Sequence, residues 1–199
     1  MSKAFQFILL TLFTAGLLVS ESCVSENPRI AIRTEFGPVI VELYPEEAPV
    51  TTENFLKYVK ESSFENSNFY RTVRMDNQPE NKIKIEVIQG GLDFSFPERM
   101  KDPIPHETTD QSGILHKDGV ISMARWKPGT ASSEFFICIG DQPELDFGGR
   151  RNSDGQGFAA FGMVVSGLEV VKRIQQMPDT LQILRSPVNI ENIVMVGDK

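Results

Sequence analysis

Cysteine and histidine are scarce in this chain, and their scarcity excludes two common ways of stabilising a small protein. Cys23 and Cys138 are its only cysteines, too few for a disulfide framework. Cys138 lies within an apolar segment and is expected to be an inert, buried side chain. His106 and His116 match no standard metal-ligand spacing, so we interpret them as part of a solvated loop and expect neither metal nor cofactor.

Clusters of basic residues are also absent from the sequence. The chain has 20 basic and 27 acidic side chains, and its formal net charge is −7. Because binding to phosphate backbones relies on clustered lysine and arginine, nucleic acid is excluded as a partner. The 40% hydrophobic and 24% charged residues are typical of a globular protein, and 199 residues fit one domain.

A long apolar run occurs at the start of the chain. Lys3 precedes an apolar stretch over residues 4–19, and Ser20 to Cys23 follow it. This layout is typical of a secretory signal, so we expect residues 1–22 to be a signal peptide and the protein to be exported to the cell envelope.

Three alternatives remain for this segment. The signal could be cleaved before Cys23, leaving a soluble periplasmic protein, or Cys23 could be lipidated, leaving a membrane-anchored lipoprotein; an uncleaved anchor is the third possibility. Ser20 and Glu21 depart from the usual lipoprotein pattern. Residues 23–27 would then be a short linker, and residues 28–199 one folded domain.

The remaining sequence is rich in short, strand-like segments. Strands are expected at 29–34, 39–43, 69–73, 83–89, 120–124, 135–139, 158–165 and 188–196. Helices are expected at 49–61, which begins with proline, and at 167–177, which ends before Pro178. Eight short strands favour closure, so the predicted fold class is mainly β, a closed eight-stranded antiparallel barrel capped by two α-helices.

The stretch SMARWKPGTASSEFFICI, from Ser122 to Ile139, places a Gly/Pro loop between two apolar segments. It resembles the cyclophilin family of peptidyl-prolyl isomerases, in which a Ser-Met-Ala segment, a Gly/Pro loop and a Gln-Phe-Phe strand follow one another. Other elements in the order of that family are Phe69-Tyr70-Arg71, Gln89-Gly90-Gly91, Phe161-Gly162 and Ser166-Gly167-Leu168-Glu169-Val170-Val171. Together they span nearly the whole chain after the signal.

The resemblance implies an exported bacterial-type isomerase that needs no cofactor, acts as a monomer and binds proline-containing segments of client proteins. Amide resonance sets a barrier of about 18–20 kcal/mol for rotation about the bond before proline. A guanidinium near the prolyl nitrogen can stabilise its lone pair as the amide twists, and Arg71 is the expected donor. The alternative is that Arg71 only covers the sheet surface or pairs with a carboxylate.

By the same resemblance, Gln89 would lie beside Arg71 as the second catalytic residue. Substrate-binding residues would be Val87, Phe136, Leu145 and Phe158 in the proline pocket, with Ala124, the Arg125 backbone and Glu134 along the peptide. Strand alternation places Glu134 and Phe136 toward the groove, and Phe135 and Ile137 toward the barrel interior. Without the resemblance, the apolar residues would be read as core and Gln89 as a surface residue.

This sequence departs from the family pattern at several positions. Glu134 replaces the expected glutamine, and we expect it to pair with Arg71. Arg125 replaces an asparagine, while Glu86 and Glu144 replace aromatic residues and predict a more polar rim. The 74–86 loop is longer than in compact members and is expected to overhang the groove. Asp146 is expected to join a turn with a local charge pair to Arg150-Arg151.

Two non-enzymatic alternatives remain. A proline-binding module or chaperone with a degenerate groove would keep the pocket but turn over poorly, and Glu134 and Glu86 favour it. A purely structural scaffold would bind no proline peptide. Substitution of Arg71 distinguishes an enzyme from a binding module, because only turnover depends on the guanidinium.

Overall fold

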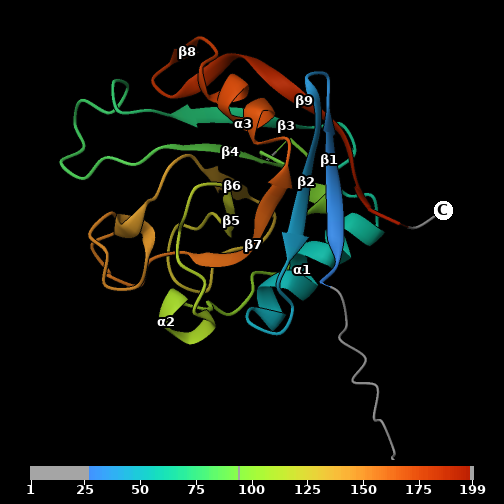
Figure 1. The fold of residues 1–199 in the computed structure, drawn as a ribbon, viewed down its shortest axis with the longest axis horizontal. Coiled ribbons are helices and arrows are strands. Elements are labelled where there is room, and N and C mark those ends of the chain that lie inside the picture. The colour runs from blue at the N-terminus through green and yellow to red at the C-terminus, as the bar shows by residue number, and fades with distance from the viewer. Residues whose placement is uncertain (1–26, 94, 198–199) are drawn as a thin grey trace, which may run out of the picture.

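The computed structural model describes residues 27–93 and 95–197 (Figure 1). The expected signal segment 1–22 and Cys23 lie outside these residues. Within the two described ranges, no helix has both the length and the apolar character needed to cross a bilayer.

Eight strands form a closed antiparallel barrel (Figure 1). They are β1 (Arg29–Thr34), β2 (Gly37–Leu43), β3 (Ser67–Val73), β4 (Val87–Gly91), β5 (Val120–Met123), β6 (Phe135–Cys138), β7 (Ala159–Ser166) and β9 (Ile183–Met195). The order around the barrel is β1-β2-β7-β5-β6-β4-β3-β9, and pairing of β9 with β1 closes it. The predicted fold class is therefore confirmed. A two-residue strand, β8 (Asp179–Thr180), pairs with β9 outside the ring.

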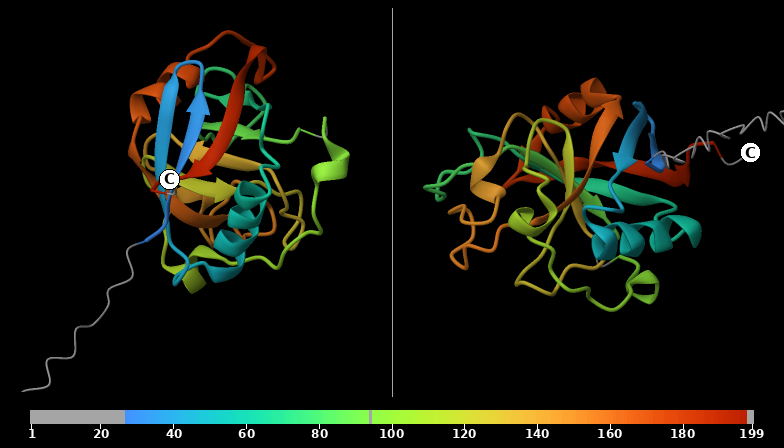
Figure 2. Two further views of the ribbon diagram at one scale, coloured as in Figure 1. Left: turned by 90° about the vertical axis from the view of Figure 1, so that its right-hand side faces the viewer. Right: turned by 60° about the horizontal axis from the view of Figure 1, so that its bottom comes forward.

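Helices cover both ends of the barrel, as Figures 1 and 2 show from different sides. The two predicted helices are present as α1 (Pro49–Lys60) and α3 (Leu168–Gln175), and a single turn, α2 (Thr109–Ser112), adds a third. The Glu107 carboxylate accepts hydrogen bonds from the first backbone N–H groups of α1, at 2.8 and 3.0 Å. These groups have no partner within the helix, so Glu107 caps it.

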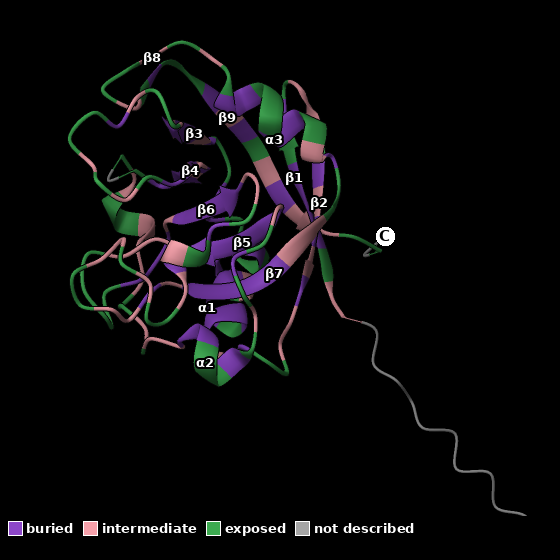
Figure 3. Ribbon diagram, turned by 60° about the vertical axis from the view of Figure 1, so that its left-hand side comes forward, coloured by how far each residue is buried: buried purple, intermediate pink, exposed green. Residues whose placement is uncertain are grey.

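Aromatic side chains fill the barrel interior, where most strand residues are buried (Figure 3). Phe55 of α1 lies with its ring centroid 5.1–5.4 Å from those of Phe64, Phe135 and Phe161. Phe135 therefore faces inward, as strand alternation predicts, while Phe136 joins a second apolar cluster on the other face of β6. That second cluster forms the base of the site described below.

Cys138 belongs to the same second cluster and is fully buried. Burial raises the pKa of its thiol well above the ordinary value of 9.0, because the thiolate would lose its hydration. The protonated thiol is therefore favoured, and the prediction that Cys138 is a buried side chain is confirmed.

The strand predicted at 83–89 begins only at Val87, and residues 83–86 are irregular. Side chains explain the difference, because they satisfy the backbone here in place of a neighbouring strand. Gln78 binds both the N–H and the carbonyl oxygen of Ile85, and Gln142 accepts from the N–H of Glu86. The alternation of apolar residues in 83–86 therefore does not indicate strand pairing.

Candidate active site

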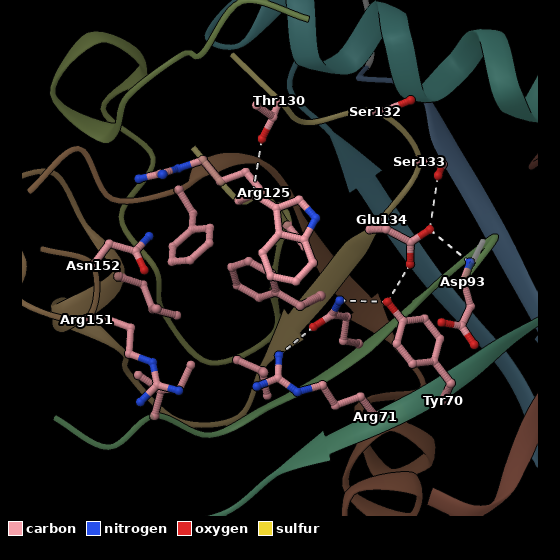
Figure 4. Close-up of a pocket in the computed structure, with 18 of the residues that line it drawn as sticks. Tyr70, Arg71, Asp93, Arg125, Thr130, Ser132, Ser133, Glu134, Arg151 and Asn152 are labelled. Carbon is pink, nitrogen blue, oxygen red and sulfur yellow. Dashed lines mark hydrogen bonds between the residues drawn. The ribbon is translucent and has the colours of Figure 1, made fainter. Parts of the chain in front are cut away.

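A cavity of about 580 Å³ lies over strands β3, β4 and β6 (Figure 4). Loops after β3, β4, β5 and β6 form its sides. All nine site residues expected from the sequence line it, namely Arg71, Val87, Gln89, Ala124, Arg125, Glu134, Phe136, Leu145 and Phe158. The fold thus brings residues from distant parts of the chain to one place.

The base of the cavity is apolar. Phe136 and Phe158 meet edge to face, with ring centroids 5.2 Å apart and planes at 87°. Leu145 and Val87 pack in the same cluster, and Ala124 contributes only a methyl group. A recess of this kind suits a small apolar ring, because pockets bury such groups among aromatic and aliphatic side chains.

His116 stacks on Phe136, with ring centroids 5.9 Å apart and planes at 16°. It is only 1% exposed, so the prediction that it lies in a solvated loop is wrong. Its Nδ1 lies 2.7 Å from Oδ1 of Asp146 and its Nε2 lies 3.0 Å from Oγ of Ser122. Asp146 also accepts from the His116 backbone N–H, so this carboxylate holds the histidine behind the pocket rather than pairing with an arginine.

The guanidinium of Arg71 lies beside the apolar base and is held by two glutamine side chains. Its Nη1 donates to Oε1 of Gln89 at 2.8 Å, and its Nη2 donates to Oε1 of Gln182 at 2.6 Å. Burial lowers the pKa of Arg71, but an arginine remains charged at physiological pH. Gln182 was not expected, because it follows β8 in a turn far from every recognisable motif.

The expected pair between Glu134 and Arg71 is wrong. Oε2 of Glu134 accepts from the Tyr70 hydroxyl at 2.5 Å. Its Oε1 accepts from the backbone N–H groups of Leu92 and Asp93 at 2.9 and 3.1 Å, and a fourth bond comes from the hydroxyl of the preceding serine. These four donors hold the carboxylate away from the guanidinium. Burial nevertheless raises the pKa of Glu134, and the hydrogen bonds oppose that rise.

Tyr70 connects the surroundings of the Arg71 guanidinium with the Glu134 carboxylate. The Nε2 of Gln89 donates to its hydroxyl at 2.7 Å, so a hydrogen-bonded chain runs from Arg71 through Gln89 and Tyr70 to Glu134 (Figure 4). Regular alternation would point Tyr70 and Arg71 to opposite faces of β3. The strand register shifts between Phe69 and Arg71, and this bulge turns both side chains toward the cavity.

Gly91 leaves room for the Glu134 carboxylate. A Cβ atom on Gly91 would lie 2.7–2.8 Å from the three carboxylate atoms of Glu134, closer than side chains normally approach. Gly91 also has a φ of 142°, a conformation that favours glycine. Gly91, the second glycine of the Gln-Gly-Gly element, is therefore needed both for the local backbone conformation and for the space that the Glu134 carboxylate occupies.

Arg125 uses its side chain to hold the long loop after Leu145. The guanidinium donates to both carboxylate oxygens of Asp154, at 2.8 and 2.9 Å, and to the carbonyl oxygen of Gly157. Trp126, the next residue, lines the cavity and is 82% exposed. It was not expected as a site residue, since one exposed aromatic in a Gly/Pro loop carries no recognisable pattern.

Glu86 and Glu144, which were expected to make the rim more polar, do not reach it. Glu86 is hydrogen-bonded to Gln175, and Glu144 is paired with Arg150, so neither carboxylate lines the cavity. The polar character of the rim comes from other residues, among them Arg151, which sequence reasoning missed. The 74–86 loop contributes Ile85 to the lining, close to its junction with β4.

A family model described as cyclophilin-type peptidyl-prolyl cis-trans isomerase matches residues 29–195. A peptidyl-prolyl cis-trans isomerase of Acinetobacter baylyi is 31% identical over 169 residues, covering 82% of this chain and 79% of that protein. Peptidyl-prolyl cis-trans isomerase B of Escherichia coli is 30% identical over 148 residues, covering 73% of this chain and 83% of that protein.

Two solved structures of a Cryptosporidium parvum cyclophilin-type peptidyl-prolyl cis-trans isomerase share the fold, with TM-scores of 0.68 and 0.69 at 21% identity. They cover 87% and 85% of this chain, and this chain covers 99% of each; the second was determined in the presence of the dipeptide Ala-Pro. With the family model matching almost all described residues, this chain belongs to the cyclophilin-type peptidyl-prolyl cis-trans isomerase family.

Proposed function

We propose that this peptidyl-prolyl cis-trans isomerase accelerates the isomerisation of X-Pro bonds in exported or envelope proteins, as a monomer. Uncatalysed exchange at such bonds takes on the order of tens to hundreds of seconds, slow enough to limit folding. The signal-like segment at residues 4–19, followed by Cys23, supports export and a lipid anchor to the membrane.

The observation that carries the catalytic proposal is the position of Arg71 at the edge of an apolar recess. Gln89 and Gln182 accept from three of its five N–H groups, so among the described residues two N–H groups remain without a partner. A prolyl ring resting on Phe136 would place its nitrogen near this guanidinium.

Rotation about the X-Pro bond removes amide conjugation and localises the lone pair on the prolyl nitrogen. A donor that bonds this nitrogen only in the twisted state stabilises the transition state more than the ground state, which is the requirement for catalysis. Arg71 provides a fixed, permanently charged donor, and Gln89 and Gln182 hold it in place. No covalent step is required.

A binding module with little turnover is the alternative, and Glu134 favours it. The family pattern that the Ser122 to Ile139 stretch resembles has a glutamine at this position, whose amide can donate to a peptide carbonyl. An ionised carboxylate only accepts, and four donors already bind Glu134. Weaker binding of the peptide backbone would lower the rate of isomerisation without removing proline binding.

Exchange spectroscopy on short Ala-X-Pro peptides tests the proposal. We expect catalytic amounts of the purified domain to accelerate cis-trans exchange well above the spontaneous rate. Binding of the same peptides without faster exchange would favour the binding module, and an absence of binding would favour a structural scaffold. Fractionation of cells tests the location separately.

A further inference from the structure

Arg151 lies at one side of the cavity, on the long loop between Leu145 and Phe158, and the isomerisation chemistry described above does not use it (Figure 4). Its Nη1 donates to the carbonyl oxygen of Ile83 at 2.6 Å, which joins this loop to the 74–86 loop. Its other guanidinium N–H groups have no partner within residues 27–93 and 95–197, so they remain available to a ligand.

The loop holds Arg151 in a fixed place. The backbone N–H of Arg151 donates to the carbonyl oxygen of Glu144 at 3.1 Å, and that of Gly149 donates to Asp146 at 2.9 Å. Farther along the loop, Arg125 clamps Asp154 and the carbonyl that precedes Phe158. A guanidinium already anchored in this way loses little conformational entropy when it binds an anion.

Each carboxylate on this loop, and the one directly before it, already has a partner. The pairs are Glu144 with Arg150, Asp146 with His116, and Asp154 with Arg125. Within the described part of the chain, no ion pair involves Arg151, although acidic residues outnumber basic ones in the whole sequence. Arg151 therefore carries a positive charge into the cavity lining that no carboxylate of the described residues neutralises.

The electrostatic surroundings of Arg151 also favour the binding of an anion. Burial lowers the pKa of Arg151, and repulsion from the positive charge of Arg71 in the same cavity lining lowers it further. The acidic side chains that line the cavity, Asp93 and Glu134, lie on the opposite side from Arg151 (Figure 4). One side of the groove is therefore positive and the other negative.

From this arrangement we propose that Arg151 forms a subsite for a carboxylate side chain next to the proline, so that the groove prefers client segments with aspartate or glutamate beside the X-Pro bond. This inference rests on the proposed function, because it names a substrate class for the same groove. A carboxylate there would accept from the fork of Arg151 and relieve its repulsion with Arg71.

The expected preference is modest and sensitive to salt. A partly exposed pair between a guanidinium and a carboxylate raises affinity by up to about fivefold. Screening by added salt reduces an exposed pair of this kind, whereas it changes apolar contacts of the prolyl ring little. The dependence on salt therefore separates the subsite from the proline pocket.

Peptide pairs that differ only in glutamate or glutamine test the proposal. The variable residue is placed directly before the proline, directly after it, or one residue farther on. For each pair, kcat/KM is measured by exchange spectroscopy and Kd by calorimetry, at low and high salt. For the wild type we expect about a three- to fivefold preference for glutamate in at least one placement, lost at high salt.

Variants assign that preference to one residue. Arg151→Gln should remove it, Arg151→Glu should replace it with a preference for lysine, and Arg151→Lys should retain part of it. Arg150→Gln is the matched control, because it removes the same charge from the adjacent residue, whose guanidinium points to Glu144. The ratio within each peptide pair is the readout, so a general loss of activity in a loop variant does not affect it.

Equal ratios for the wild type and Arg151→Gln would overturn the subsite, and so would an equal loss in Arg150→Gln, which would indicate an effect of net charge alone. If the wild type binds glutamate peptides more tightly through Arg151 but does not accelerate exchange, the subsite stands and the enzymatic proposal fails. If it accelerates exchange with no glutamate preference, the enzymatic proposal stands and the subsite fails. Failure to bind any peptide would overturn both.

Discussion

The hydroxyl of Tyr70 donates to the carboxylate of Glu134 at 2.5 Å, and this contact determines how the polar side of the cavity is arranged. Because the hydroxyl proton is directed to Glu134, the same oxygen accepts from Nε2 of Gln89. The amide of Gln89 then presents its oxygen, and not its nitrogen, to Arg71. The orientation of the expected catalytic guanidinium thus depends on a residue that does not touch it.

Tyr70→Phe should lower kcat about two- to tenfold with little change in KM, because the loss of one hydrogen bond frees the Gln89 amide to rotate. Because the hydroxyl also donates to the Glu134 carboxylate, two hydrogen bonds are lost, and the free energy of unfolding should fall by about 2–3 kcal/mol. Steady-state exchange kinetics and thermal melting provide both values. Tyr44→Phe is the control, since Tyr44 does not line the cavity. Wild-type kcat in Tyr70→Phe would remove Tyr70 from any positioning role.

Glu134 should make stability depend on pH in a distinctive direction. Its pKa in the folded protein is raised above the ordinary value of 4.5, so the folded state binds this proton more tightly than the unfolded state does. The contribution of this proton to the free energy of unfolding is therefore greatest below pH 4.5 and is lost as pH rises through the raised pKa. The melting temperature of Glu134→Gln should therefore rise relative to that of the wild type as pH increases from below 4.5 through the raised pKa. A constant difference would contradict the burial of an ionisable group here.

Asp154 should show the opposite dependence. Its hydrogen bonds with Arg125 lower its pKa to about 2 from the ordinary 3.8. The stabilisation is therefore present above about pH 4 and is lost as pH falls toward 2. Since Asp154 lies near the surface, we expect a small effect, seen as a shallower acid loss of melting temperature in Asp154→Asn than in the wild type. Parallel acid curves would indicate that the pair with Arg125 does not persist in solution.

Cys23→Ala tests the proposed lipid anchor. If Cys23 is lipidated, the variant should move from the membrane to the soluble envelope fraction, and mass spectrometry of the wild type should find an acyl group on the mature N-terminus. Cys138→Ala is the control, because that cysteine is buried in the barrel wall and should not affect location. An unchanged distribution of Cys23→Ala, with no acyl mass on the wild type, would rule the anchor out.

Much of the fold could be predicted because strands and motifs carry strong local signals. The alternation around Phe135 and Phe136 correctly assigned one ring to the core and the other to the groove. The irregular segment 83–86 could not be predicted, because distant glutamine side chains and not a strand satisfy its backbone. His116 was misplaced for a similar reason, since its partner Asp146 lies 30 residues away.

The sequence predicted which residues line the site better than it predicted the contacts among them. Family order placed nine residues at one cavity, but the expected contact between Glu134 and Arg71 ignored the bulge that turns Tyr70 between them. Gln182 and Arg151 come from a turn and a long loop, where spacing carries no information about which side chains reach a groove. Contacts of this kind depend on the folded chain and not on a local pattern.

The most direct measurement of the central claim is the rate of cis-trans exchange in an X-Pro peptide with the wild type, Arg71→Ala and a control, Arg33→Ala, whose arginine is exposed on β1. We expect Arg71→Ala to lose on the order of a hundredfold in kcat/KM while still binding the peptide, because the donor to the prolyl nitrogen is removed and the apolar recess remains. Arg33→Ala should match the wild type. An Arg71→Ala variant that isomerises the peptide as fast as the wild type would contradict the account.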